Sequence, residues 1–358
     1  MDPQNLLEKT AYWPFRFARI FGVWPFALQN RLLIFRWGSP GTILSILNLS
    51  IYITCYCLVG KNKHTIILRR LENPSTTHLD LVGQSAIANL KTFCVIFLYL
   101  SCLLNRHNFV RVWNNISRIT TALANASQFC HLSSPALAQC EARNMKRQKY
   151  LTMYVLVLSL VHAAIEVAPI SENLARHLKP STAAQLSLVF FTWSFYSNMY
   201  AFFVAMLVGM VQTVEDCFAI LSLSLHTLTA AESKPGTSPA VIVSNQNKPW
   251  DAKRVRHIIK FGQDLETAVE EMNGRLKPQL LFVIAMMVFI LTVGAFFAAK
   301  TIQSRLVNVD YFGTLVMVFL SYSIFHMFCR RCGGLITQVN VYENIIKHSE
   351  KVYTRIPE

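Results

Sequence analysis

The sequence predicts an all-α fold: a polytopic transmembrane helix bundle with six spans. Hydrophobic residues make up 53% of the 358 residues and charged residues only 15%, whereas soluble domains carry about 25% charged residues. Uncharged apolar blocks recur along the chain. The block at residues 278–299 would form about 33 Å of helix, enough to cross a hydrocarbon core of about 30 Å. Lysine and arginine lie between the blocks, as expected for cytoplasmic loops.

Six apolar blocks are expected to cross the membrane. The segment before the first block, residues 1–36, is expected in the cytoplasm. Within it, residues 12–28 are rich in Trp, Phe and Arg, which is typical of a segment on the membrane surface. The expected spans, in chain order, are 37–60, 82–104, 150–170, 182–212, 278–299 and 311–329.

The polar segments between the spans differ in length. Residues 105–149 predict a cytoplasmic helical segment, and residues 213–277 and 330–358 are also expected in the cytoplasm. The fourth span lies in an uncharged run of 35 residues, 180–214. This run is longer than one crossing needs, so its helix is expected to continue beyond the bilayer. Residues 230–251, rich in Pro, Ser, Asn and Lys, predict a disordered insert.

Residues 253–277 predict an amphipathic anchor helix that leads directly into the fifth span. Apolar residues recur there at alternating steps of three and four, which places them on one stripe of a helix. Charged residues occupy the other faces, and a bend toward the span is expected at Pro278. The stripe consists of Val255, Ile258, Gly262, Leu265, Val269 and Met272.

The distribution of Lys and Arg predicts a cytoplasmic N-terminus. With that orientation, the inside segments hold 25 of the 34 Lys and Arg residues and the outside loops hold 8, as the positive-inside rule requires. The outside loops, at residues 61–81, 171–182 and 300–310, are all short. We therefore expect helices that extend into the cytoplasm and little protein mass outside.

Motifs and charge argue against several other classes of protein. No HExxH, GxSxG or phosphate-binding P-loop pattern occurs in the sequence, so we expect no enzyme activity, cofactor or metal. The net charge of +15 would be compatible with nucleic-acid binding. However, the basic residues lie between apolar blocks and no nucleic-acid motif occurs, so we expect a lipid bilayer rather than nucleic acid as the surrounding partner.

Three ionisable residues at membrane depth are candidates for a ligand site, because charges inside a bilayer are costly and usually face a cavity or a partner. Lys91 lies on the order of 13 Å below the outer end of the second span. His162 lies at a similar depth in the third span, and Glu166 follows one helical turn later on the same face. If the spans are neighbours, Lys91 can extend toward Glu166. The three residues form either the wall of a polar, outward-opening pocket or one ion pair that fixes helix packing.

The fourth span adds aromatic residues at the same level. Trp193 and Tyr196 run from its outer end toward its middle, followed by Asn198 and Tyr200. Aromatic residues in this position serve either in core packing or in a ligand cage. The candidate ligand-binding residues are therefore Lys91, His162, Glu166, Trp193 and Tyr196.

Two stretches carry a resemblance to a known family. In FARIFGVWPF, Arg19, Gly22 and Pro25 resemble the R-x-x-G-x-x-P opening of the insect chemoreceptor superfamily of gustatory and odorant receptors. In residues 269–297 an amphipathic helix leads into a Phe-containing span, which is similar to the gustatory-receptor pattern. The layout is also similar over the whole chain, with an inside N-terminus, long cytoplasmic segments and short outer loops.

The resemblance implies a ligand-gated, non-selective cation channel subunit in the plasma membrane. It would bind a small-molecule tastant or odorant in the outer half of the bundle. It would assemble as a homo- or hetero-tetramer with related receptor subunits, packed through its cytoplasmic helices. The family has seven spans, and the seventh helix lines the pore. Six spans are expected in residues 1–358, so we expect that these residues alone do not supply the pore lining.

Other assignments remain open as alternatives to a gustatory-type receptor. The pair Trp24-Pro25 is more typical of odorant receptors of the same superfamily. A GPCR-like receptor would have its N-terminus outside and would usually carry an acidic-Arg-aromatic motif after the third span. A small-molecule transporter often shows inverted repeats and helices broken by Gly or Pro, and the sequence shows neither.

The predicted orientation is tested by an epitope tag at the N-terminus. We expect antibody to reach the tag only after the cells are permeabilised, because the positive-inside rule places this end in the cytoplasm. Staining of intact cells would instead support a GPCR-like topology.

Overall fold

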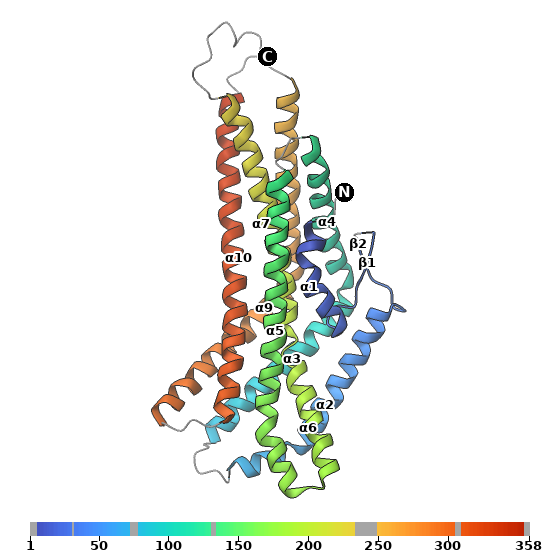
Figure 1. Cartoon of the computed structure of the whole chain (residues 1–358), viewed down its shortest axis with the longest axis vertical. Coiled ribbons are helices and arrows are strands. Elements are labelled where there is room, and N and C mark those ends of the chain that lie inside the picture. Colours follow the sequence, from blue (N-terminus) through green and yellow to red (C-terminus); the bar gives the residue numbers. More distant parts are fainter. Residues whose placement is uncertain are drawn as a thin grey trace.

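The computed structural model is a bundle of long helices with one short hairpin (Figure 1). It describes residues 6–30, 32–71, 78–129, 134–232, 249–304 and 309–353. The elements are α1 (Leu6–Ile20), β1 (Ala27–Gln29), β2 (Leu32–Ile34), α2 (Pro40–Leu71), α3 (His78–Leu104), α4 (Arg106–Phe129), α5 (Ser134–His177), α6 (Pro180–Tyr196), α7 (Tyr200–Glu232), α9 (Pro249–Ser304) and α10 (Val309–Tyr353).

Six stretches of the described helices are long and apolar enough to cross a membrane, which confirms the predicted all-α polytopic bundle. Each stretch overlaps one expected span, and the fourth comprises α6 together with most of α7. The stretches are Pro40–Lys61, Ser85–Leu104, Ala142–Arg176, Pro180–His226, Val255–Phe297 and Leu315–Lys347.

Several helices are much longer than a membrane crossing. Helices α5, α9 and α10 have 44, 56 and 45 residues, so they run for about 66, 84 and 68 Å, at least twice the hydrocarbon thickness. Parts of the expected outer loops are helical too, since α2 continues to Leu71 and α5 to His177. Of the expected disordered insert, residues 233–248 lie outside the described residues.

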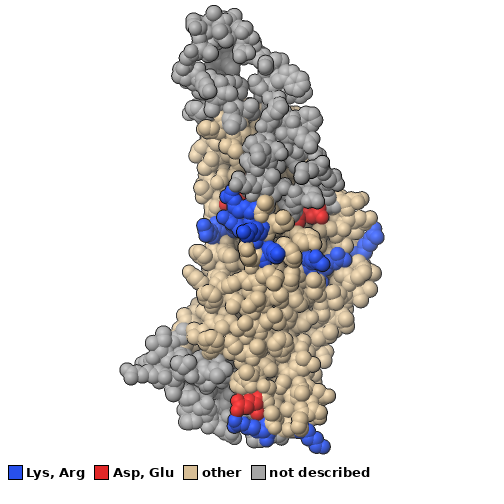
Figure 2. Space-filling view, viewed as in Figure 1, with Lys and Arg blue, Asp and Glu red and all other residues tan. Residues whose placement is uncertain are grey.

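The ends of the helices alternate between the two ends of the bundle. Helices α2, α5 and α9 end, and α3, α6 and α10 begin, at the lower end of Figure 1, whereas α7 and α10 finish at the upper end. Figure 2 shows a broad zone without charged residues between a band of Lys and Arg above and a small charged group at the lower tip. This distribution is the one expected of a membrane-crossing zone.

Helix α7 forms the centre of the bundle. All fifteen residues from Tyr200 to Val214 are buried, and α1, α5, α9 and α10 pack around the helix. A helix that is apolar on all faces either faces lipid or is enclosed by other elements, and α7 is enclosed. This explains why the uncharged run is longer than one crossing: its second half is the core of the protein.

The chain leaves the α-helical path between α6 and α7, at Ser197, Asn198 and Met199. The Asn198 N–H donates to the Phe195 carbonyl at 3.1 Å, an i→i−3 bond typical of a 3₁₀ turn. No Gly or Pro marks this break. Instead, Ser197 Oγ and Asn198 Nδ2 both donate to the Ser194 carbonyl, at 2.7 and 3.3 Å, in place of a backbone N–H. The expected single fourth helix is therefore two helices.

The N-terminal segment inserts between helices. After α1, Gly22 takes φ +69°, and a Cβ there would lie 2.7 Å from Asn48 Nδ2 and 2.9 Å from Ser45 Cα, so both the backbone angle and the contact with α2 require glycine. The following Trp24 and Phe26 are 1% and 0% exposed. Most aromatic residues of the expected membrane-surface segment, residues 12–28, thus pack inside the protein.

Most of the predicted apolar stripe of α9 is buried within the same chain, and its last two residues, Val269 and Met272, are half-buried. Leu265 is 0% exposed, and the helix continues without interruption through Pro278. Gly262 lies against Tyr342 of α10, whose hydroxyl donates to the Ile258 carbonyl at 3.0 Å. A Cβ at Gly262 would be 1.9 Å from Tyr342 Oη. Glycine at this position therefore lets α10 approach the α9 backbone.

Gly262→Ala is expected to destabilise the protein by about 1–3 kcal/mol, because the new methyl group overlaps the enclosed Tyr342 ring. Gly274→Ala is the matched control on the same helix, since a Cβ at Gly274 meets nothing within 4 Å. It should be neutral or stabilising by up to about 1 kcal/mol, because alanine favours a helix. Thermal unfolding of the detergent-purified variants measures both effects. Equal melting temperatures for the two variants would contradict this packing.

Candidate functional site

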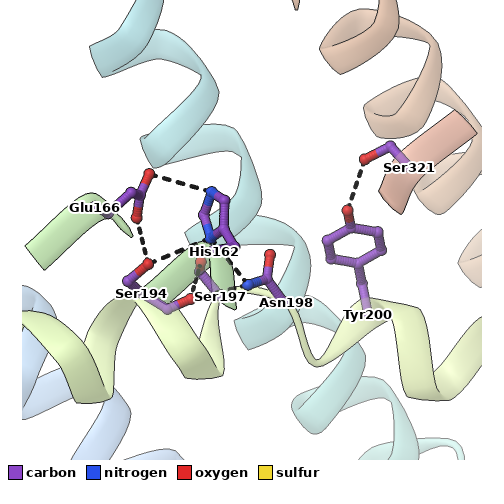
Figure 3. A network of polar contacts seen from close by, with 7 residues as sticks. All are labelled: His162, Glu166, Ser194, Ser197, Asn198, Tyr200 and Ser321. Atoms are coloured by element: carbon purple, nitrogen blue, oxygen red, sulfur yellow. Dashed lines mark hydrogen bonds and ion pairs between the residues drawn. The ribbon is translucent and has the colours of Figure 1, made fainter. Parts of the chain in front are cut away.

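A polar network joins α5 to the end of α6 at the helix break (Figure 3). His162 Nε2 lies 3.3 Å from Glu166 Oε1, one turn further along α5. Ser194 Oγ donates to Glu166 Oε2, and Asn198 Nδ2 lies 3.2 Å from His162 Nδ1. The i, i+4 spacing thus places His162 and Glu166 side by side, and the end of α6 supplies the groups that bind them.

The contacts of His162 define its tautomer. The Asn198 amide nitrogen can only donate, so Nδ1 of a neutral imidazole accepts and the proton lies on Nε2. This N–H faces Glu166, at ion-pair distance but outside hydrogen-bond geometry. The His162 side chain is 0% exposed and that of Glu166 is 38% exposed. The carboxylate is therefore the part of the network that reaches the surface of the chain.

Ser, His and Glu also form hydrolytic triads, but their connection here differs. In a triad the serine hydroxyl donates to the histidine, and the acid holds the other imidazole nitrogen. Here the Ser194 hydroxyl donates to Glu166. Its oxygen lies 3.5 Å from His162 Nδ1, which accepts from Asn198. The serine proton therefore faces the Glu166 carboxylate and not the imidazole, which is not the relay of a triad, so the arrangement suits binding better than acyl transfer.

Lys91, on α3, is 2% exposed. Its ammonium group is attracted by the charge of Glu166. Among the described residues, no hydrogen bond or direct ion pair with Lys91 is formed. The interaction therefore acts through space, and a tight ion pair that would fix the packing of α3 on α5 is not present between these two residues.

Trp193 and Tyr196 bind α2 and α3 instead of the His162 network. Trp193 Nε1 donates to Thr92 Oγ1 at 3.2 Å, and the Tyr196 hydroxyl donates to Asn48 Oδ1 at 3.0 Å. Thr92 Oγ1 also accepts from the Tyr52 hydroxyl at 3.1 Å. The predicted residues thus fall into two groups: His162 and Glu166 in the network, and Trp193 and Tyr196 bound to α3 and α2. The groups are neighbours because Trp193 is adjacent in the chain to Ser194, which belongs to the network.

Sequence reasoning did not single out Ser194 or Thr92. Both are small hydroxyl residues inside apolar spans, and that is their only signal. The same signal is given by hydroxyl residues that bond only within their own helix, such as Thr213, which donates to the Gly209 carbonyl at 2.9 Å. Spacing along one helix therefore could not separate the two kinds of residue.

Three buried polar atoms of this region have no hydrogen-bond partner among the described residues. They are Ser159 Oγ, His162 Nε2 and Asn198 Oδ1. Ser159 precedes His162 by three residues, so the two lie on the same face of α5. Buried polar atoms are normally satisfied by protein or water. The network therefore retains hydrogen-bonding capacity for a polar molecule.

Comparison with known proteins indicates a receptor family. A family model described as 7tm chemosensory receptor matches residues 15–340. The matched region begins within α1, ends within α10 and contains all five predicted site residues. No curated protein matches the chain significantly.

Thr92→Val should destabilise the protein by about 2 kcal/mol or more, because the Tyr52 and Trp193 donors both lose their acceptor. Thr92→Ser keeps the hydroxyl and should remain close to the parent protein. Thermal unfolding in detergent measures the difference. If the valine and serine variants were equally stable, Trp193 would not depend on Thr92 and would be available to a ligand.

Proposed function

This chain belongs to the 7tm chemosensory receptor family, whose model matches residues 15–340 of its 358, and we propose that it is a gustatory-type receptor subunit that binds a small-molecule tastant in the outer half of its helix bundle. Membership of this family implies a small-molecule ligand. The six apolar helices and the family together make the chain a multi-pass membrane protein. We further propose that it acts in the plasma membrane.

The single observation that carries the proposed site is a polar network enclosed in an apolar bundle. Ionisable groups are costly at membrane depth and are usually found where they serve a ligand, an ion or a partner. Here an imidazole, a carboxylate and an ammonium group come from two different helices, α5 and α3. Hydrogen-bonding atoms of Ser159 and Asn198 remain without partners among the described residues.

The chemistry of the network favours a particular kind of ligand. Glu166 offers a partly exposed carboxylate, which accepts hydrogen bonds from hydroxyl or amine groups. Lys91 and the His162 Nε2 proton can donate to an oxygen of the same molecule. We therefore propose a small ligand with both donor and acceptor groups, such as a polyol or an amino alcohol.

Ligand binding would reach the core of the protein through the helix break. Ser194 and Asn198 take part in the network and also hold the break through the Ser194 carbonyl. A ligand that displaces either side chain would change the geometry at which α6 meets α7. We propose that this movement gates a non-selective cation pathway in a tetramer of this subunit or of related subunits.

The site is tested by Glu166→Gln in cells challenged with a panel of sugars, polyols and amines. We expect ligand sensitivity to fall about tenfold or more, since a charged hydrogen-bond partner contributes about 1.5–3 kcal/mol. Lys91→Ala and His162→Ala should act in the same direction. Surface expression, measured on the same cells, should remain intact.

The matched control is Glu172→Gln, also on α5, where the carboxylate is 65% exposed and pairs with Arg176. It should leave ligand sensitivity unchanged, because an exposed ion pair contributes little. If Glu166→Gln abolishes surface expression instead, the network serves packing rather than recognition. Currents recorded with and without a seventh apolar span joined to residue 358 separate ligand binding from conduction.

A further inference from the structure

Helices α1 and α5 bring basic and aromatic side chains together on one surface. Lys149 Nζ of α5 lies 5.3 Å from the centre of the Trp13 ring of α1. Tyr12 packs edge-on against Trp13 at 5.5 Å, and its hydroxyl accepts from Arg16 Nη1 at 3.1 Å. One turn before Lys149, Lys146 Nζ lies 6.0 Å from the Tyr150 ring. We call these six residues the α1–α5 basic cluster.

The cations of this cluster have no acidic partner among the described residues. Arg16, Lys146 and Lys149 are exposed, and so are Arg143 and Arg147 nearby on α5. None of these five cations forms an ion pair with an acidic side chain in the part of the chain that the structure describes. Arg176, near the other end of α5, differs in this respect because it pairs with Glu172. The surface therefore presents a concentrated positive field.

The cluster lies where the charge-free zone of the molecule ends. Figure 2 shows Lys and Arg gathered over α5 at the upper edge of that zone. Tyr12 and Tyr150 are 42% and 63% exposed. Aromatic rings with a polar tip prefer the level of lipid headgroups, where one end meets hydrocarbon and the other meets water. We infer from this that the cations and aromatic rings of the cluster lie at the depth of the phosphate layer.

We propose that the α1–α5 basic cluster binds the headgroup of an anionic phospholipid. The phosphate would lie between Arg16 and Lys149, which come from different helices, while Tyr12 and Trp13 contact the glycerol region and the upper acyl chain. Basic sites between helices at the cytoplasmic side of a membrane recognise anionic headgroups in this way. The bound lipid would hold α1 against α5, and therefore beside the core helix α7.

The simpler explanation is that these residues only set topology, by remaining on the cytoplasmic side. The two explanations differ in what they require. A topology signal needs net charge near the end of a span, at any position. A headgroup site needs the charges at Arg16 and Lys149 in particular, and an aromatic ring beside them.

The test uses the full purified chain and phosphatidylserine, with bound lipids counted by native mass spectrometry during a titration. Arg16→Gln combined with Lys149→Gln should weaken phosphatidylserine binding about 30-fold, given the usual contribution of two basic side chains near an anionic surface. Phosphatidylcholine binding should not change. Arg16→Lys combined with Lys149→Arg should restore phosphatidylserine binding, because the charges are kept.

The matched control removes the same amount of charge elsewhere, by Lys61→Gln combined with Lys179→Gln. Both lysines are exposed; Lys61 lies in the second half of α2 and Lys179 lies between α5 and α6. This control should bind phosphatidylserine like the parent. Equal losses in the two double variants would show that only total charge matters and would overturn the proposal.

Competition between phosphatidylserine and inorganic phosphate tests whether the cluster binds a lipid headgroup or a free anion. Millimolar inorganic phosphate should fail to displace phosphatidylserine, because the proposed site also contacts the lipid body through Trp13. Displacement by free phosphate would assign the cluster to a soluble anion and overturn the lipid assignment. Trp13→Leu, which changes no charge, should lower phosphatidylserine binding measurably. Unchanged binding in this variant would also contradict the proposed site.

Discussion

The enclosure of α7 is the constraint on which the rest of the bundle depends. A helix that is buried on every face for fifteen residues cannot use water or lipid to satisfy its polar side chains, so the surrounding helices must do so. The Tyr200 hydroxyl is bonded to Ser321 of α10 at 2.8 Å. Further along, Gln212 accepts from Gln148 of α5 at 3.0 Å and donates to Asn144. These bonds fix the rotation of the outer helices about α7 as well as their distance from it.

The same constraint brings the candidate site into contact with the core. The 3₁₀ turn at Ser197, Asn198 and Met199 is the only part of this path that is not α-helical, and it lies between the polar network and α7. A 3₁₀ turn inside a helical path is held by fewer well-aligned bonds than the helices beside it. Small movements of the His162 or Ser194 side chain would therefore change the backbone of the turn before they change the backbone of α6 or α7.

Much of the fold could be predicted from the sequence, because apolar runs and the period of the α9 stripe depend on single helices. The contact between His162 and Glu166 could also be predicted, because their spacing of four residues lies within one helix. The helix break could not be predicted, since Ser197 and Asn198 are common within helices and act here only through the Ser194 carbonyl. The contacts of Trp193 depend on which face of α6 meets α3, which no single helix specifies. The polar residues at the ends of α2 and α5 were predicted as loops, but they are helical. Their composition could not distinguish the two, because exposed helices are equally polar.

The placement of α1 has a consequence for the order of assembly. Helix α1 (Leu6–Ile20) packs on α7 (Tyr200–Glu232), which is made much later, and contacts so distant in sequence form slowly. Gly22 already meets Ser45 and Asn48 of α2, whereas the face of α1 that packs on α7 must wait until α7 has entered the membrane. Until then the face of α1 that packs on α7 lacks its partner, and it is a natural target for chaperones during biogenesis. The contacts between α1 and α7 would therefore be among the last of the bundle to form.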